Sequence, residues 1–417
     1  MHDDDEFINE EAHKKFQTMN LTCVRIGFGK VAQVHEAMLS ELGVRTIGVF
    51  EPDCARHQAI RERGFHVVQS IDEAAALSPD FFDVCAPTEH HTDVLEQINK
   101  IAPRANVIME KPFCAFADIS RMDDILMRHR GRVVVNENYS SSEVVVSIKR
   151  EMKSLGLKVT RVIVELSKHR GEDFLANRYQ DPILGALGFD GAHLLAIAND
   201  LGHPVNFSDV RDVDIDSIFY DAHQVSDLNV NNLIQDPVTG NMSLSHQGGA
   251  CIQYVSEAGC LVDLYSSMSG IIGFPCPPFA PTIERIAFND SHIKYRHVRI
   301  DGIASDGKNY QVAGFLEPVT NLDRNIGAIA VFCEWTLSKP ILFVADSTMK
   351  QHMEKILSFF LGDGQNPYSP EQAISDVQQL HHWAQLGWMD MTDSNDVLGH
   401  PDKAAARAVE AQRFRLA

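Results

Sequence analysis

Residues 25–38, RIGFGKVAQVHEAM, decide the fold class of this chain. They join a run of strand-forming residues to a segment whose apolar residues recur at helical spacing. Gly27 permits a tight turn, Gly29 lets the backbone approach a bound group, and Ala32 is small enough for close packing of helix on strand. This Gly-x-Gly-x-x-Ala pattern between a strand and a helix predicts a site for the pyrophosphate of a dinucleotide.

Glu51 supports the same prediction. It ends the second predicted strand, 22 residues after Gly29, where an acidic side chain can accept hydrogen bonds from ribose hydroxyls. An acid at this place repels a 2′-phosphate, and no arginine follows it immediately. The sequence therefore favours NAD over NADP.

Strand-like and helix-like segments alternate up to about residue 140, which is typical of parallel βαβ units with helices on both faces of the sheet. Longer segments with partial two-residue alternation follow, such as KVTRVIVEL (158–166), and they predict a mostly antiparallel sheet with one covered face. The expected fold class is α/β followed by α+β. The expected parts are a polar N-terminal extension (1–20), a dinucleotide-binding domain (21–140), an α+β domain (141–388) and a C-terminal tail (389–417).

The composition excludes several classes of protein. The 417 residues include 37 basic and 57 acidic side chains, and the net charge of −20 leaves no evident basic surface for nucleic acid. The eight cysteines form no CxxC pair, which argues against a zinc knuckle or a thioredoxin-like site, and we expect no metal. The N-terminal stretch is acidic where a signal peptide is basic and then apolar, and no apolar run has membrane-spanning length. We therefore expect a cytoplasmic protein without membrane contact.

A second informative stretch is VIMEKPF (107–113), an apolar strand that ends abruptly in Glu110-Lys111-Pro112. From the residues alone, Lys111 is either a solvated cation paired with Glu110 or a side chain held over a ligand. The glycine turn upstream favours the ligand, because the fifth strand of such a sheet ends where a nicotinamide ring would lie.

The order of these motifs resembles the Gfo/Idh/MocA oxidoreductases, a family that includes inositol and glucose–fructose dehydrogenases. The resemblance is carried by Gly27–His35, by a Pro-x-x-x-His turn at Pro87–His91 and by residues 110–112, and it extends with less specificity to about residue 388. It implies a Rossmann domain followed by an open-faced, mostly antiparallel β-sheet domain with helices on one side. That second domain would bind the substrate and form a homodimer or homotetramer.

The resemblance also assigns a role to Lys111. It implies that Lys111 touches the substrate hydroxyl and aligns it with the nicotinamide, and that the peptide bond before Pro112 is cis. The residue type agrees, because a proline at a strand end fixes the backbone angle φ.

The second motif of the family, Asp-x-Gly-x-His on a helix, is altered here. Gly191 and His193 align with it, but Phe189 occupies the place of the aspartate and Asp190 follows one residue later. Asp190 and His193 are three residues apart, so both can line one pocket. Histidine as a residue type titrates near neutrality, which makes His193 the candidate general base for the hydroxyl proton. A histidine that only packs a helix is the alternative.

Residues at the ends of the predicted strands supply further candidates. The predicted cofactor contacts are Gly27, Gly29, Lys30, Val31, Glu51, Pro87, Thr88, His91, Glu110 and Lys111. The predicted substrate contacts are Lys111, Asn138, Tyr139, Arg170, Tyr179, Asp190 and His193. Asn138 and Tyr139 stand where the family often has an arginine and an aromatic residue, so a substrate cannot simply be transferred from the family. An exposed charged loop is the alternative for Arg170 and Tyr179.

The expected activity is hydride transfer between NAD and a secondary alcohol, or its ketone, of a sugar, sugar phosphate or cyclitol. Two alternatives stay open. One is an imine or enone reductase of the same family, and the other is a non-catalytic protein that senses NAD(P).

Overall fold

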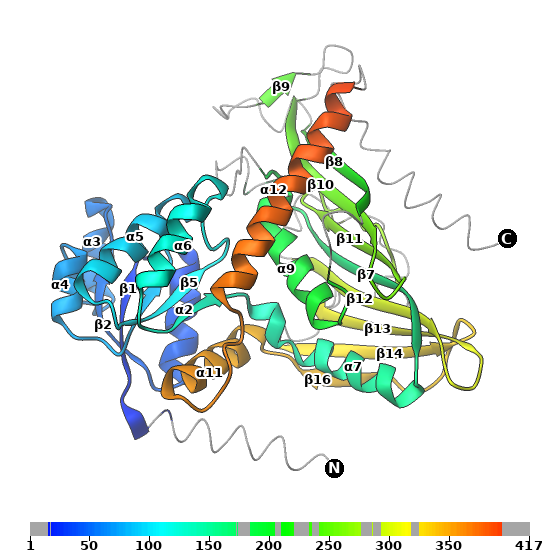
Figure 1. Ribbon diagram of the computed structural model, residues 1–417, viewed down its shortest axis with the longest axis horizontal. Coiled ribbons are helices and arrows are strands. Elements are labelled where there is room, and N and C mark those ends of the chain that lie inside the picture. The colour runs from blue at the N-terminus through cyan, green and yellow to red at the C-terminus, as the bar shows by residue number, and fades with distance from the viewer. Residues whose placement is uncertain are drawn as a thin grey trace. The chain divides into compact units, whose positions relative to one another are not determined.

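The structure is a computed structural model, and two compact units make up the chain (Figure 1). The first unit consists of Met1–Ser141 and Thr348–Gln378, and the second of Ser142–Ser347 and Gln379–Ala417. The sequence pattern predicts the boundary near residue 140 but not the return of the chain to the first unit. The described residues are 16, 18–171, 173, 184–204, 210–220, 233–235, 242–276, 286, 293–317 and 325–393.

The first unit contains a six-stranded parallel sheet with the strand order of a dinucleotide-binding fold. In spatial order its strands are β3 (Val67–Val68), β2 (Arg45–Phe50), β1 (Thr22–Ile26), β4 (Phe81–Val84), β5 (Asn106–Glu110) and β6 (Val133–Asn136). The connecting helices are α2 (Lys30–Glu41), α3 (His57–Glu62), α4 (Ile71–Ala76), α5 (Thr88–Ile101) and α6 (Ile119–Arg128). Short 3-10 turns occupy η1 (Cys54–Arg56), η2 (Phe116–Asp118) and η3 (Asn138–Ser141).

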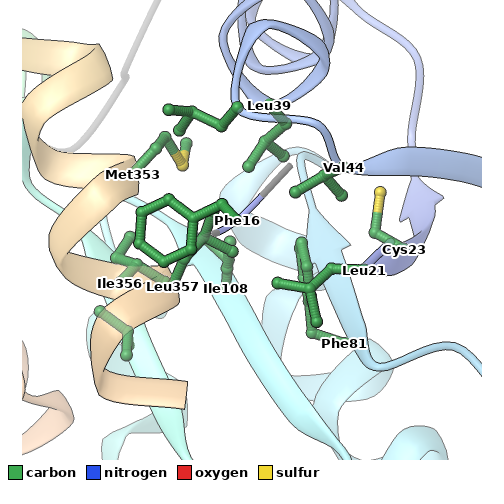
Figure 2. Packing of buried hydrophobic residues seen from close by; sticks show 12 residues of the cluster. Phe16, Leu21, Cys23, Leu39, Val44, Phe81, Ile108, Met353, Ile356 and Leu357 are labelled. Carbon is green, nitrogen blue, oxygen red and sulfur yellow. The ribbon is translucent and has the colours of Figure 1, made fainter. Parts of the chain in front are cut away.

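Helix α11 (Thr348–Leu361) belongs to the first unit because its apolar face completes that unit's core. Met353, Ile356 and Leu357 are fully buried there. Figure 2 shows Phe16 beside them, and this ring, 1% exposed, comes from the predicted polar extension. An apolar side chain within that extension is therefore part of the core, and its burial stabilises the unit by about 1.5–3 kcal/mol.

The second unit contains a ten-stranded sheet that is antiparallel except at one pair among its described strands, β7 with β11. Its main path is β15 (Thr336–Leu337), β14 (Ile326–Cys333), β13 (Asn309–Glu317), β12 (Lys294–Ile303), β7 (Lys158–Lys168), β11 (Leu261–Ser267), β10 (Met242–Val255) and β8 (Val210–Tyr220). Off this path, β16 (Leu342–Ala345) pairs with β14 and β9 (Leu233–Gln235) pairs with β10.

Helices α7 (Glu143–Leu155) and α9 (Leu187–Asp200) cover one face of this second sheet. Ser142 begins α7 by accepting a hydrogen bond from the Val145 amide, and Gly156 ends the helix in the left-handed conformation. The helix packs closely because Gly314 of β13 lacks a side chain: an added Cβ would lie 2.6 Å from Val144. Figure 1 shows α7 running along β13, β14 and β16.

The opposite face of the sheet carries its own apolar cluster. Tyr295 and Phe315 from the strands pack there with Ile272, Cys276 and Ile286 from the segment after β11. Helix α12 (Pro370–Asp393) ends beyond residue 389, where the C-terminal tail is predicted to begin. The segment RIAFND (285–290), whose residues also suggest a strand, lies outside the described residues except for Ile286.

The expected fold class is confirmed: a parallel Rossmann sheet with helices is followed by a mostly antiparallel sheet domain. Within the described part of the chain, no helix combines the length and the apolar character needed to cross a membrane.

Candidate active site

The glycine turn after β1 has the geometry that the motif predicts. Gly27 has a φ of +84°, and a Cβ added to it would lie 3.0 Å from the carbonyl oxygen of Cys85. Gly29 precedes α2 and provides no side-chain cap, and the first turn of α2 contains no acid. A Cβ on Gly29 would meet no atom of the chain within 4 Å.

This turn fits a dinucleotide. Helix α2 begins with Lys30 and Val31. Because no side chain caps its first amides, these amides and the positive end of the helix dipole are available to an anion. Ala32 is fully buried, as close packing of α2 requires.

Glu51 lies directly after β2 and is held by three groups of the chain. Its Oε2 accepts from the Phe28 amide at 2.9 Å and pairs with Arg56 Nη1 at 3.0 Å, while Oε1 accepts from the Asp53 amide at 3.2 Å. Arg56 Nη2 also donates to the Phe28 carbonyl at 2.6 Å. A guanidinium thus lies beside the predicted ribose-binding acid, five residues further along the chain. Because Arg56 does not follow Glu51 immediately in the sequence, this pairing was not predicted.

His91 joins the turn after β4 to the turn after β5. Its Nδ1 lies 3.0 Å from the Pro112 carbonyl oxygen, and its Nε2 lies 2.8 Å from the Ala86 carbonyl oxygen. Burial lowers the pKa of His91, although hydrogen bonds to these carbonyls oppose the shift. The peptide between Lys111 and Pro112 is cis, as the resemblance implied. The ring therefore fixes the backbone on both sides of the predicted nicotinamide end.

Pro87 and Thr88 lie at the start of α5, which also has no side-chain cap. Asn138 and Tyr139 lie in η3, just after β6. Asn138 Nδ2 donates to Thr348 Oγ1 at 2.7 Å, and Tyr139 is 3% exposed. Asn138 therefore ties η3 to the start of α11, and the contact of either side chain with a substrate stays a prediction.

A network of charged side chains lies buried beneath this edge of the sheet. Arg25 of β1 donates from Nε to Asp83 Oδ2 at 2.8 Å and from Nη1 to Glu36. Asp83 Oδ1 lies 2.9 Å from His35 Nδ1, and Asp83, His35 and Arg25 are each 0% exposed. Burial alone would raise the pKa of Asp83, but His35 and Arg25 hold it well below its usual range.

Three potential metal ligands meet in this network, namely His35, Asp83 and Cys85, with ligand atoms within 4.8 Å of one another. Burial raises the pKa of the Cys85 thiol to about 12, and its sulfur lies 3.4 Å from His35 Nδ1 and 3.5 Å from Asp83 Oδ1. The imidazole and the carboxylate already bond to each other. In the structure these three side chains join in one hydrogen-bonded network.

The second unit gathers the remaining candidates around α9. Asp190 and His193 are 2% and 7% exposed, and Arg296 Nη2 of β12 lies 3.8 Å from Asp190 Oδ1. The Arg170 guanidinium lies over the Phe189 ring, 5.5 Å from its centroid. The aromatic residue in the aspartate's place is thus a platform for a cation.

Sequence reasoning missed Arg296. The alternation in HIKYRHVRI (292–300) places it on the same face as two buried residues, Val298 and Ile300, and a buried arginine requires an acidic partner. Tyr179 lies outside the described residues. Lys111 belongs to the first unit, whereas Asp190 and His193 belong to the second.

Gly191 allows α9 to approach α12, and this contact predicts a stability effect. A Cβ at Gly191 would lie 2.4 Å from Leu380 Cδ2. We expect Gly191→Ala to lower the free energy of unfolding by about 1–3 kcal/mol through overpacking. Urea denaturation of Gly191→Ala, Leu380→Ala and the double variant tests the cause, since the second change removes the clash. Strictly additive losses would show that the clash is not responsible.

Comparison with known proteins agrees with the geometry of the first unit. Residues 21–137 match the model of the Gfo/Idh/MocA oxidoreductase family, described as an oxidoreductase family with an NAD-binding Rossmann fold. No curated protein sequence matches the chain.

Solved structures of dehydrogenases share the fold of nearly the whole chain. The WlbA dehydrogenase of Bordetella pertussis, solved with NADH and UDP-GlcNAcA, is 14% identical, with 88% of this chain and 97% of that chain covered and a TM-score of 0.58. The UDP-N-acetylglucosamine 3-dehydrogenase GnnA of Acidithiobacillus ferrooxidans is 12% identical, with coverages of 88% and 97% and a TM-score of 0.57.

GenD2 from gentamicin A biosynthesis, solved with NAD, is 16% identical, with coverages of 88% and 94% and a TM-score of 0.55. At such identities these similarities concern the fold alone. The family match over residues 21–137 confirms the resemblance drawn from the glycine turn and from Glu110-Lys111-Pro112: the N-terminal domain of this chain matches the NAD-binding Rossmann domain of the Gfo/Idh/MocA oxidoreductases.

Proposed function

We propose that the chain is a dehydrogenase that transfers a hydride between NAD and a secondary alcohol or ketone of a sugar-type substrate. The observation that carries the proposal is the position of Lys111. It directly follows β5, on the sheet edge where the glycine turn and Glu51 also lie, and His91 bonds to the carbonyls of the next two residues. Such an edge binds ligands in open parallel sheets.

The chemistry assigns a role to each candidate. NAD, when bound, supplies the carbon that accepts the hydride. Lys111 donates a hydrogen bond from Nζ to the substrate oxygen, which orients and polarises it. His193 takes the hydroxyl proton, so the C–H electron pair can leave as hydride and the alcohol becomes a ketone. Asp190, beside Arg296, offers an acceptor for a second hydroxyl, and Arg170 offers a cation for an anionic group.

The substrate class follows from these groups and from the structural relatives. Sugars, sugar phosphates and cyclitols carry adjacent hydroxyls that suit a lysine, an acid and a histidine together. Two of the relatives are named for, or were solved with, a nucleotide sugar. A cation at Arg170 is compatible with such a diphosphate. We therefore add nucleotide sugars to the substrates to be tested.

The test is nicotinamide reduction by the purified chain, with NAD and with NADP, against sugars, sugar phosphates, cyclitols and nucleotide sugars. Turnover of one class supports the dehydrogenase and names its substrate. Tight NAD binding without turnover of any alcohol or ketone would contradict it. Activity on C=N or enone substrates would then select the reductase, and an NAD-dependent complex with another protein would select the sensor.

The preference for NAD rests on Glu51, and the neighbouring Arg56 makes it testable. We expect Glu51→Ala to shift the ratio of kcat/KM for NAD over NADP towards NADP by roughly 100-fold, since a like-charge repulsion disappears and Arg56 is released to meet a 2′-phosphate. Steady-state kinetics with both cofactors measure the ratio. Glu51→Ala combined with Arg56→Ala should lose much of the gain. An unchanged ratio in Glu51→Ala would remove Glu51 from cofactor selection.

The proposed assembly is a homodimer or homotetramer through the sheet of the second unit, in the cytoplasm. Sedimentation of the purified chain measures the number of subunits. A monomer at micromolar concentration would contradict this part of the proposal.

A further inference from the structure

His35 links α2, the helix after the glycine turn, to β5, the strand that Lys111 directly follows. The ring is fully buried, and its two nitrogens face two carboxylates. Nδ1 lies 2.9 Å from Asp83 Oδ1, and Nε2 lies 2.8 Å from Glu110 Oε1. Glu110 immediately precedes Lys111, and its Oε2 accepts from the Lys111 amide at 3.2 Å.

This arrangement places charged side chains in a buried region, where apolar side chains are usual. Two cations, Arg25 and His35, alternate with three carboxylates, Glu36, Asp83 and Glu110. Burying such groups costs several kcal/mol each before their mutual attraction is counted, and apolar residues of similar volume are often at least as stable. Stability of the sheet by itself therefore gives little reason for a charge at His35.

We propose that His35 is a positioning residue of the hydride-transfer site, holding the Glu110 carboxylate in place and through it the neighbouring Lys111. The inference rests on the function proposed above. His35 itself is too deeply buried to touch a substrate, and its effect reaches Lys111 only through Glu110.

The electrostatics agree with the geometry. Burial lowers the pKa of His35, whereas Cys85 and Asp83 raise it, and the result lies well above the usual value. Burial likewise raises the pKa of Glu110, but hydrogen bonds from His35 and Asn136 bring it below the usual value. Both groups are thus charged near neutral pH. The groups that face the ring are Asp83 and Cys85 from the end of β4, Glu110 from β5 and Asn136 from β6, with Arg25 behind Asp83.

His35→Gln tests the proposal, because glutamine keeps a polar side chain but carries no charge. We expect kcat to fall roughly 10- to 100-fold through misplacement of Lys111, with Kd for NAD changed less than about threefold. His129→Gln is the matched control: His129 lies 2.9 Å from the Ala105 carbonyl oxygen, just before the opposite end of β5. It should lose stability without this loss of kcat.

The pH profile separates positioning from a merely structural role. Without His35, the buried Glu110 should bind a proton, so turnover of His35→Gln should rise with pH as Glu110 ionises. The wild type should lack this ionisation, because its Glu110 pKa is already lowered. In His35→Gln with Glu110→Gln, the rise should vanish and kcat should fall no further than in the single variant. Losses that multiply, or a wild-type profile in His35→Gln, would overturn the proposal.

A readout without turnover keeps this inference distinct from the proposed function. Acylation of Lys111, followed by mass spectrometry, reports how accessible its amine is to the reagent. Misplacement of Glu110 should move Lys111, whose amide Glu110 holds, so we expect His35→Gln to change the acylation rate by about threefold or more. If His35→Gln does not fold, Glu110→Gln alone must give a change in the same direction. Unchanged acylation rates would refute the positioning role even if no substrate is found, whereas a turnover panel without activity refutes only the proposed function.

Discussion

Lys111→Ala is expected to lower kcat by about 10³-fold and to leave Kd for NAD within about threefold, because the role proposed for the lysine is to act on the substrate oxygen and not on the pyrophosphate. The described hydrogen bonds of Glu51, which we propose binds the cofactor together with the glycine turn, do not involve this side chain. Single-turnover hydride transfer and NAD titration measure the two quantities separately.

Two variants make the Lys111 experiment specific. Lys100→Ala removes an exposed lysine of α5 whose only described partner is Glu96 on the same helix, and it should leave kcat unchanged. Lys111→Arg keeps the charge but changes the position of the donor atoms, so it should recover only part of the rate. If Lys111→Ala retains more than about a tenth of the wild-type kcat, the lysine is no donor to the reacting oxygen, since such donors contribute more.

Asp83→Asn is expected to lower the free energy of unfolding by about 3–5 kcal/mol, the usual cost of breaking a buried ion pair from one side. The carboxylate faces both Arg25 and His35, and all three side chains are 0% exposed. Asparagine would leave two buried cations without their anion. Equilibrium unfolding in urea measures the loss, and Asp80→Asn, an exposed carboxylate three residues earlier, should cost far less.

The pH dependence of that loss has a definite sign. The native pKa of Asp83 is lowered from 3.8, so its stabilisation is present above that value and disappears as the pH falls. The native pKa of His35 is raised from 6.5, so its stabilisation is present below that value and is lost as the pH rises through the native pKa. The difference between wild type and Asp83→Asn should therefore be largest between these two ordinary pKa values. An equal difference at every pH would mean that shape, and not charge, explains the loss.

The fold of the first domain could be predicted from sequence because its motifs are local. A glycine turn, its acid and a lysine–proline strand end each depend on residues that are near one another in the chain, so their spacing carries the information. The segment TMKQHMEKILSFFL (348–361) has apolar residues at helical spacing, which also predicts a helix from local sequence, and the structure forms α11 at those residues. The sequence did not predict which core this helix covers. The apolar face of the helix could pack against either unit, and its position depends on partners such as Phe16.

Sequence by itself therefore determined the fold class and the glycine turn, and it identified Lys111 and His193 as candidates. Only the tertiary structure decided that Arg25 meets Asp83, 58 residues away, that Arg56 pairs with Glu51, and that Arg296 faces Asp190. The physical reason is that a buried charged side chain needs a partner of opposite charge, but the local sequence around it does not identify that partner. The partner is fixed by strand order and register, which bring distant segments side by side.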